Sequence, residues 1–250
     1  MEGPWKGLLF HLKEIDALPE IPILYQDDFL AVANKPAGLL TQALGVPGVK
    51  EANLEAALSL QLGYPVWVAH RLDRATSGLV LISKAQEHLP PLQGLFQKRQ
   101  VQKEYRAVVV GSFEDSRGKI DTPLSVPHEP GKEQKALTEY RVLSSHTFLL
   151  PHHRPDRLSL TEMHVTLHTG RKHQIRRHFG GIGYPLLGDM LYGQDNYNRV
   201  PPRVWQVNHL WLHSHRLAFR HPILDTALNC AVEPPANWQP VLRHMSPFLP

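Results

Sequence analysis

The sequence is poor in the features that cross-link a protein covalently or anchor it in a membrane. It contains one cysteine, Cys230, so an internal disulfide is excluded, and a lone cysteine is more often a small buried side chain than a reactive thiol. No apolar run approaches the roughly 20 residues that span a bilayer. The first residues carry acids at Glu2 and Glu14 and only a short apolar run, unlike a signal peptide. We therefore expect a cytoplasmic protein without a membrane segment.

The sequence also lacks the spacings that are typical of metal sites. Its 16 histidines include His213 and His215, whose rings would share one side of a strand. However, neither a His-Glu-x-x-His nor a Cys-x-x-Cys pattern is present, and no nearby carboxylate completes a site. We therefore expect no functional metal.

Neither sign of charge dominates the chain. Lysine and arginine number 27 against 23 aspartates and glutamates, which gives a net charge of +4 and an isoelectric point near 9.2. This mild basic excess fits an RNA-binding protein but is also common among unrelated proteins. With 250 residues and 42% hydrophobic content, the chain can bury a sizeable core as one large or two small domains.

The most informative segment that is present is 70–78, His-Arg-Leu-Asp-Arg-Ala-Thr-Ser-Gly. It places the carboxylate of Asp73 between the guanidiniums of Arg71 and Arg74. Apolar, strand-like runs flank the segment on both sides, so we expect Asp73 on a loop that leaves a strand. The two arginines favour an ionised carboxylate, which is a competent nucleophile, and they can clamp a phosphate. A structural or solvated ion pair is the common alternative for such a cluster.

This segment resembles the catalytic signature of the RluA-type pseudouridine synthases, His-Arg-Leu-Asp-x-x-Thr-Ser-Gly. Further segments agree with that family in order and spacing: the hairpin at 27–38 with its Asn-Lys-Pro-x-Gly turn, Lys103-Glu104-Tyr105, and the run 169–178 with its continuation in Leu187-Gly188-Asp189 and Tyr192-Gly193. The resemblance spans about Ile23 to Val232, which is nearly the whole chain.

The resemblance implies catalytic roles for Asp73, Tyr105 and Arg176. Asp73 would attack the target uridine and allow its base to detach and rejoin through carbon. Tyr105 would stack on the flipped base and take the proton from carbon 5, and Arg176 would pair with Asp73. Arg71 would fill the gap that the uridine leaves, which offsets part of the few kcal/mol that base flipping costs. The reaction is an isomerisation and the family uses no metal, so no cofactor is expected.

Substrate binding is implied for seven further residues, all basic: His70, Arg74, Lys103, Arg171, Lys172, His173 and Arg177. On a helix Lys172 and Arg176 share a face, whereas Arg177 lies about 100° further round. The resemblance directs Arg176 towards Asp73 and leaves Arg171, Lys172 and Arg177 for phosphates. A solvated basic face is the alternative.

The apolar pattern predicts many strands and few helices. We expect strands within 23–33 and at 105–110 (with Tyr105 at its start), 136–143, 158–167, 211–219 and 228–232, helices at 53–62, 91–98 and 173–179, and a loop over 111–134. This predicts an α+β fold with a mixed, largely antiparallel central sheet and flanking helices and loops, which is the pseudouridine synthase fold that the resemblance implies. Residues 1–20 would be an N-terminal extension of unassigned role, and 21–250 a single catalytic domain.

Segments 69–70, 173–178 and 210–214 are most similar to the tRNA pseudouridine synthase C branch of the family, which modifies uridine 65 of tRNA. The implied partner is therefore a tRNA, bound by a monomer. The branch with dual specificity for tRNA and ribosomal RNA is the near alternative. Two other classes stay open: a catalytically silent RNA-binding protein on the same fold, and an aspartate-nucleophile hydrolase of phosphates. The first is disfavoured by the three catalytic residues, and the second by the lack of a carboxylate near Asp73 to hold magnesium.

Overall fold

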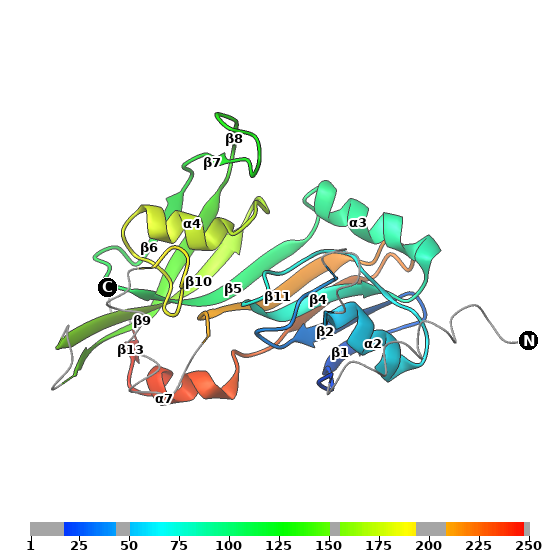
Figure 1. Cartoon of the computed structure of the whole chain (residues 1–250), viewed down its shortest axis with the longest axis horizontal. Helices are drawn as coiled ribbons and strands as arrows, with labels where there is room; N and C mark the ends of the chain where they lie inside the picture. The colour runs from blue at the N-terminus through cyan, green and yellow to red at the C-terminus, as the bar shows by residue number, and fades with distance from the viewer. Residues whose placement is uncertain (1–17, 44–50, 151–155, 194–208, 248–250) are drawn as a thin grey trace, which may run out of the picture. The chain divides into compact units, whose positions relative to one another are not determined.

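The structure is a computed structural model that describes residues 18–43, 51–150, 156–193 and 209–247 (Figure 1). Most of the expected N-terminal extension therefore lies outside the described residues. The sequence also predicts an exposed turn at 152–157, whose first four residues lie outside them, and a short loop at 195–203, which lies outside them entirely. Contacts group the chain into two compact units, drawn from the described parts of Met1–Val101 with Arg216–Val232 and of Gln102–His215 with Glu233–Pro250.

The first unit is a small antiparallel sheet with helices on both sides. Its elements are β1 (Ile23–Gln26), β2 (Leu30–Lys35), α2 (Leu54–Leu62), β3 (Trp67–Val68), β4 (Ser77–Ser83), η1 (Gln86–His88), α3 (Leu89–Gln97), the end of β11 (Leu212–Arg220) and β12 (Ala227–Ala231). The strand order is β1-β2-β4-β11, with β3 also beside β4 and β12 beside β11. Figure 1 shows α2 and α3 on opposite sides of β2 and β4.

Alternation of side chains along β2 and β4 decides which residues meet each helix. Val32 lies opposite Leu81, and both belong to the apolar cluster that includes Leu92 and Leu95 of α3. The intervening residues of both strands point to the other face and are also buried, so β4 is buried along its whole length. The sheet in this unit is therefore covered on both faces, and its loops carry the polar groups.

Helix α2 has the limits that its sequence predicts. The Asn53 side chain accepts a hydrogen bond from the Ala56 amide at 2.9 Å, and Gly63 ends the helix in the left-handed conformation. The Glu55 carboxylate then accepts the Val68 amide at 3.0 Å. The helix is thereby joined to β3, the strand that leads to Asp73.

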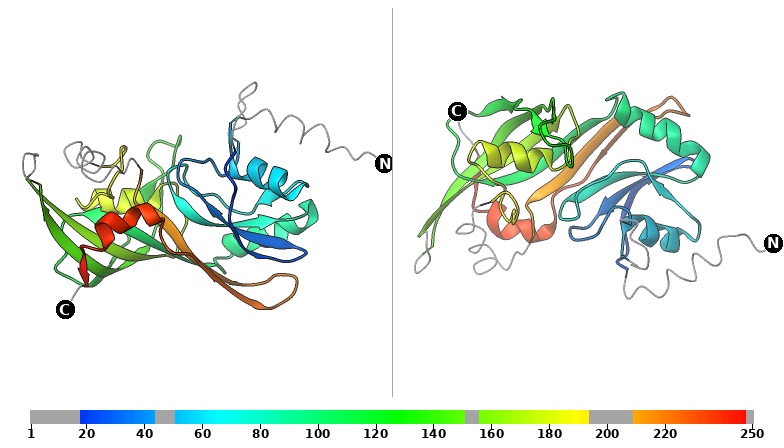
Figure 2. Two further views of the ribbon diagram at one scale, coloured as in Figure 1. Left: turned by 90° about the horizontal axis from the view of Figure 1, so that it is seen from below. Right: turned by 45° about the horizontal axis from the view of Figure 1, so that its top comes forward.

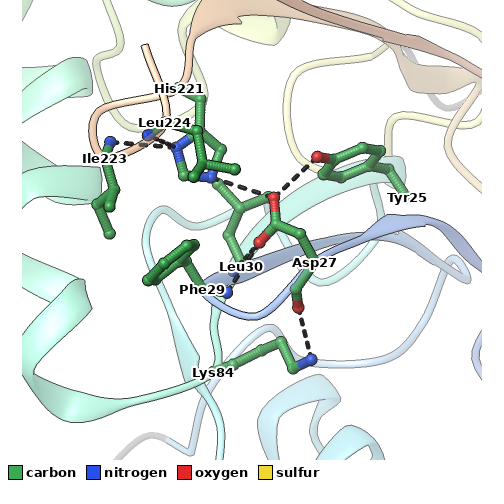
Figure 3. A network of polar contacts seen from close by, with 8 residues as sticks. All are labelled: Tyr25, Asp27, Phe29, Leu30, Lys84, His221, Ile223 and Leu224. Carbon is green, nitrogen blue, oxygen red and sulfur yellow. Dashed lines mark hydrogen bonds and ion pairs between the residues drawn. The ribbon is translucent and has the colours of Figure 1, made fainter. Parts of the chain in front are cut away.

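A polar network holds the β1–β2 hairpin to the turn that joins β11 and β12 (Figure 3). Asp27 accepts hydrogen bonds from the Tyr25 hydroxyl and from the amides of Phe29 and Leu30, and its side chain lies 3.1 Å from Nε2 of His221. Nδ1 of His221 accepts two backbone amides of its own turn. These contacts join the turn of the hairpin to the turn between β11 and β12.

The second unit is built on longer antiparallel strands. Its elements are β5 (Gln102–Val110), β6 (Arg117–Ile120), β7 (Leu124–Ser125), β8 (Glu133–Gln134), β9 (Thr138–Leu149), β10 (Arg157–Leu167), α4 (Gln174–Gly181), the start of β11, η2 (Ala236–Trp238), α7 (Gln239–Leu242) and β13 (Ser246–Pro247). The strand order is β11-β5-β10-β9-β13, with β6 also beside β9, and β7 and β8 form a separate hairpin. The paired strands β9 and β10 run side by side in both views of Figure 2.

The two faces of this sheet have different neighbours. On one face Tyr140 of β9 contacts Phe179 of α4, with ring centroids 5.5 Å apart. On the other face Val108 and Val110 of β5 pack in one cluster with Trp238 of η2 and with α7. Since successive residues of a strand alternate between faces, the register of β5 assigns Tyr105 to the α4 face and Arg106 to the opposite face.

Several expectations about the elements were wrong in detail. The strand expected at 136–143 is β9, which runs from Thr138 to Leu149. Strand β5 begins at Gln102, so Tyr105 is an interior residue of the strand and not its first. The segment 111–134 contains β6, β7 and β8, which have too little apolar alternation to be predicted and form because they pair with β9 or with each other. Helix α3 begins two residues early, at Leu89, and α4 continues two residues beyond its expected end at 179, through Gly180 and Gly181.

The whole is an α+β arrangement with a mixed, mostly antiparallel sheet, as predicted. Among the described residues, no helix is both long enough and apolar enough to cross a membrane.

Candidate active site

Asp73 lies on a short loop of the first unit between β3 and β4, as the sequence predicts. The two strands pair antiparallel, with Val68 opposite Ile82. The loop closes where the Thr76 amide donates to the Asp73 carbonyl at 3.0 Å. Asp73 is half-buried, whereas Arg71 and Arg74 on either side are exposed. The carboxylate is therefore carried by a tight loop between two exposed guanidiniums.

Hydrogen bonds join this loop to the turn that follows β2. The Gly38 amide donates to the Arg74 carbonyl at 2.8 Å, and Nε of Arg74 donates to the Gly38 carbonyl at 2.9 Å. Thr41 makes two further bonds to the backbone of Leu72, as donor at 2.8 Å and as acceptor at 3.1 Å. The Asn-Lys-Pro-x-Gly turn and the His-Arg-Leu-Asp signature thus form one braced structure.

Lys35 lies at the centre of this structure, although the sequence assigned it no role. It is fully buried, and its Nζ donates to the carbonyls of Pro36, Leu39 and Arg74 at 2.9, 2.7 and 3.2 Å. Burial lowers the pKa of Lys35 to about 7, and the negative charge of Asp73 opposes this shift. Two sequence signals could have identified it: Lys35 ends a buried apolar strand, and it is the lysine of the Asn-Lys-Pro-x-Gly turn.

His70, which was expected to bind substrate, makes contacts within the fold. Its Nε2 accepts a hydrogen bond from the Leu81 amide at 3.1 Å. Its ring also lies on Phe96 of α3, with centroids 4.3 Å apart. These contacts fix the first residue of the signature between β4 and α3, and a role in RNA binding stays a prediction.

Tyr105 lies within β5 of the second unit, opposite Val165 of β10. It is 7% exposed, so only a small part of the side chain reaches the surface. Lys103, two residues earlier and on the same face, donates to the Thr169 carbonyl at 3.5 Å, at the limit for a hydrogen bond. The strand therefore directs the Lys-x-Tyr motif towards the loop before α4.

The loop before α4 is held by the buried amide of Gln174. Its Oε1 accepts the Thr169 hydroxyl at 2.7 Å and the Arg171 amide at 3.0 Å, and its Nε2 donates to the Leu137 carbonyl at 3.0 Å. His173 occupies the left-handed region with φ +55°, and its Nδ1 lies 3.0 Å from the Tyr192 hydroxyl. One glutamine thus orders the loop that presents the basic residues.

Arg176 of α4 forms a two-pronged buried ion pair with Asp189. Nε and Nη2 each donate to one carboxylate oxygen at 2.8 Å. Oδ1 of Asp189 also accepts the amides of Leu191 and Tyr192. Burial alone would raise the pKa of Asp189, but the hydrogen bonds from Arg176 and the two amides hold it below its ordinary value. Asp189 belongs to the Leu-Gly-Asp segment of the resemblance, yet its role as a partner of Arg176 was not predicted. The pairing of Arg176 with Asp73 stays a prediction.

Close packing explains why glycine precedes Asp189. Gly188 has φ +76°, and a Cβ there would lie 2.2 Å from the His209 carbonyl oxygen. Any other residue would displace the backbone that delivers Asp189 to Arg176.

Three of the predicted phosphate-binding residues line one pocket of about 150 Å³ in the second unit. These are Arg171, Lys172 and Arg177, which face the β7–β8 hairpin across the pocket. Arg177 donates to the carbonyl and hydroxyl oxygens of Ser125 in β7, and Nε of Arg171 donates to the Lys135 carbonyl. Neutral acceptors leave the charge of both guanidiniums available to an anion.

Comparison with known proteins assigns the chain to a family. Residues 29–180 match the family model for RNA pseudouridylate synthase, a range that contains all eleven predicted site residues. The chain belongs to this family, and its catalytic signature is that of the RluA type.

The curated relatives place the chain more narrowly. It is 34% identical over 229 residues to tRNA pseudouridine synthase C of Pasteurella multocida, a match that covers 87% of this chain and 93% of the relative. It is also 34% identical over 227 residues to the dual-specificity RNA pseudouridine synthase RluA of the same organism, covering 86% and 94%. The solved structure of human RNA pseudouridylate synthase domain containing 4 has a TM-score of 0.69 at 26% identity, covering 98% of this chain and 97% of that one.

Proposed function

We propose that this chain isomerises a specific uridine of tRNA to pseudouridine, with Asp73 as the nucleophile. The observation that supports this proposal most directly is the Asp73 loop, which has the family signature. The buried Lys35 and the Thr41 side chain hold the backbone of this loop by hydrogen bonds. Similarity to tRNA pseudouridine synthase C over most of both chains supports tRNA as the substrate. Uridine 65 is the position that this similarity favours.

In the proposed reaction Asp73 attacks the target uridine after the base has left its stack. The glycosidic bond to nitrogen breaks, the base turns, a bond from the ribose to carbon 5 forms in its place, and the bond to Asp73 is released. Nitrogen 1 ends with a proton and carbon 5 ends without one, so the number of protons on the base is unchanged. Tyr105 stacks on the base and removes the proton from carbon 5, while Arg71 fills the space that the nucleotide leaves. Substrate and product have the same atoms, so the chemistry balances without a redox partner.

The basic pocket supports the binding part of this proposal. Gln174 holds the backbone of Arg171 and Ser125 holds the side chain of Arg177, so these two residues of the pocket are positioned before RNA binds. Phosphate contacts of this kind supply much of the affinity for RNA and fix its orientation without reading its sequence.

The direct test uses purified protein and an unmodified tRNA transcript, with pseudouridine mapped nucleotide by nucleotide. Wild-type protein should modify one position, and Asp73→Ala should modify none while keeping its RNA affinity within about tenfold, because phosphates dominate binding. Turnover by Asp73→Ala would remove this residue from the nucleophile role. RNA binding without any product from the wild type would identify a silent RNA-binding protein.

Dual specificity is a second candidate, favoured by the 34% identity to the RluA relative. Pseudouridine mapping in total RNA from cells with and without the gene separates the two. Loss of a single tRNA site supports tRNA specificity, and simultaneous loss of a ribosomal RNA site supports dual specificity.

A further inference from the structure

The face of the second unit's sheet that lies opposite Tyr105 carries a row of basic side chains. Arg117 of β6 lies opposite Arg141 of β9, Arg141 lies opposite His164 of β10, and His164 lies opposite Arg106 of β5. Residues directly opposite each other in antiparallel strands share a face and have neighbouring Cβ atoms. Four basic side chains therefore cross four strands side by side.

Three residues of this row, Arg117, Arg141 and His164, open onto a pocket of about 480 Å³. Its lining includes Arg117, Lys119, Glu139, Arg141, His164 and Thr166 of this face, together with Gly118 and Tyr140, which lie between them along β6 and β9. The volume lies within the range of about 300–1,000 Å³ that holds small ligands. A pocket of this volume can hold a single nucleotide.

The acids of this face already have partners. Glu139 lies 2.9 Å from His168, Glu104 lies 2.9 Å from His164, and Glu162 forms an ion pair with Arg106. The cations outnumber these acids. Within the described part of the chain Arg117, Lys119 and Arg141 form no ion pair, and all three are exposed.

The opposition of Arg117 and Arg141 is unfavourable without an anion. Like charges directly across a strand pair destabilise the sheet. Two adjacent guanidiniums instead suit a phosphate, which accepts parallel N–H hydrogen bonds from each. An anion between the two guanidiniums would remove their repulsion and accept hydrogen bonds from both.

We propose that this pocket is a second phosphate-binding site, formed by Arg117 and Arg141 with Lys119 beside them, on the sheet face opposite Tyr105. Its ligand is a phosphate group, either of RNA or of a free phosphorylated compound. The site uses none of the residues assigned to the reaction, so it stands independently of the proposed function.

The test compares wild type with Arg117→Gln/Arg141→Gln and with the charge-matched control Arg157→Gln/Arg243→Gln, whose arginines are exposed and lie outside the pocket. Inorganic phosphate is titrated and followed by phosphorus NMR and by the thermal midpoint. Phosphate should raise the midpoint of the wild type and of the control, and the affinity of the pocket variant should fall by about tenfold, since bonds from charged donors are lost.

Binding of tRNA distinguishes the two sources. If the phosphate belongs to RNA, the pocket variant should bind tRNA more weakly than the control, with a salt dependence reduced by about 0.7–0.9 for each lost contact and an unchanged rate at saturating tRNA. If it belongs to a free compound, only inorganic phosphate binding should fall. Pocket and control variants that match in both assays would overturn the site.

Discussion

At the scale of single residues, the least expected contributor to the Asp73 loop is a buried ammonium. Lys35 has three carbonyl acceptors, which match the three protons of its charged form, while a neutral amine can donate only two. The pKa of about 7 therefore means that deprotonation near neutrality changes the hydrogen bonding beneath the loop.

The pH dependence of stability should reveal this group. The pKa of Lys35 is lower in the folded protein than the ordinary lysine value, so between about pH 7 and 10 the unfolded chain binds more protons. Stability should then rise with pH at up to about 1.4 kcal/mol per unit. Chemical denaturation from pH 6 to 10 should show this rise in the wild type and its loss in Lys35→Met. Equal slopes for both proteins would contradict the lowered pKa.

Tyr105→Phe separates the two roles proposed for one side chain. The ring would still stack on the base, worth about 1–3 kcal/mol, so RNA binding should survive. Removal of the hydroxyl should lower the single-turnover rate by about 10²–10⁴-fold, as expected for loss of a general base. Tyr105 is nearly buried and phenylalanine is nearly isosteric with it, so the substitution should leave the fold intact. A loss of rate would then report the missing hydroxyl. A rate close to wild type would leave Tyr105 with stacking alone.

Arg176 should matter for stability as well as for activity. Arg176→Met leaves the carboxylate of Asp189, which has no exposed side-chain surface, without its cation, at a cost of about 3–5 kcal/mol. Arg176→Met/Asp189→Leu should recover much of this stability. The depressed pKa of Asp189 contributes stability above pH 4 that is lost on acidification, so the wild type should lose more stability below pH 4 than the double variant. Additive effects of the two substitutions in urea unfolding would refute the coupling.

At the scale of elements, the sequence predicted what local chemistry decides. Helix α2 follows from Asn53, from the apolar residues one turn apart and from Gly63, all of which act within the helix. Strand β6 does not follow from local chemistry. Its residues, Arg117-Gly-Lys-Ile, show no apolar alternation, and the strand with which it pairs begins 18 residues later. The Asp189 partner of Arg176 was missed for a similar reason, since only the folded chain brings it to α4.

The cap of α2 gives an element-scale test. Asn53→Ala removes the acceptor of the Ala56 amide and should destabilise the protein by about 1 kcal/mol, with a lower thermal midpoint. Asn53→Asp retains a carboxyl oxygen at the same place and should stay close to wild type. Because Glu55 of this helix holds β3, the alanine variant should also lower the rate of the Asp73 reaction slightly. An unchanged midpoint for Asn53→Ala would show that the cap is dispensable.

At the scale of the whole molecule, composition predicted little of what matters for RNA. The net charge of +4 is small, and the residues proposed to bind phosphates are instead grouped, as around the pocket of Arg171, Lys172 and Arg177. The division of contacts into two units was also beyond the sequence, because the chain passes between them three times without a linker of distinctive composition. The single catalytic domain over 21–250 stays a prediction.

Affinity for tRNA should therefore depend on salt through a few specific contacts. Each phosphate contact contributes about 0.7–0.9 to the slope of log affinity against log salt. Arg177→Gln should reduce the slope by the value of about one contact. Arg220→Gln should leave the slope unchanged, because Arg220 is exposed and forms a salt bridge with Asp225. Filter binding between 50 and 200 mM salt, about the range in which such contacts weaken most, measures both. Equal slopes would remove Arg177 from the RNA interface.

Two consecutive residues of β5 point to opposite faces of the sheet, Tyr105 to the face that α4 covers and Arg106 to the other. A deletion or insertion of a single residue before this pair would exchange the faces of the whole strand, burying Arg106 against the α4 side and moving Tyr105 out of place. Natural variants of this enzyme should therefore tolerate length changes in the connection between β6 and β7 but none within β5. A library of one-residue deletions scanned along 102–125 and scored for pseudouridine would map this intolerance directly.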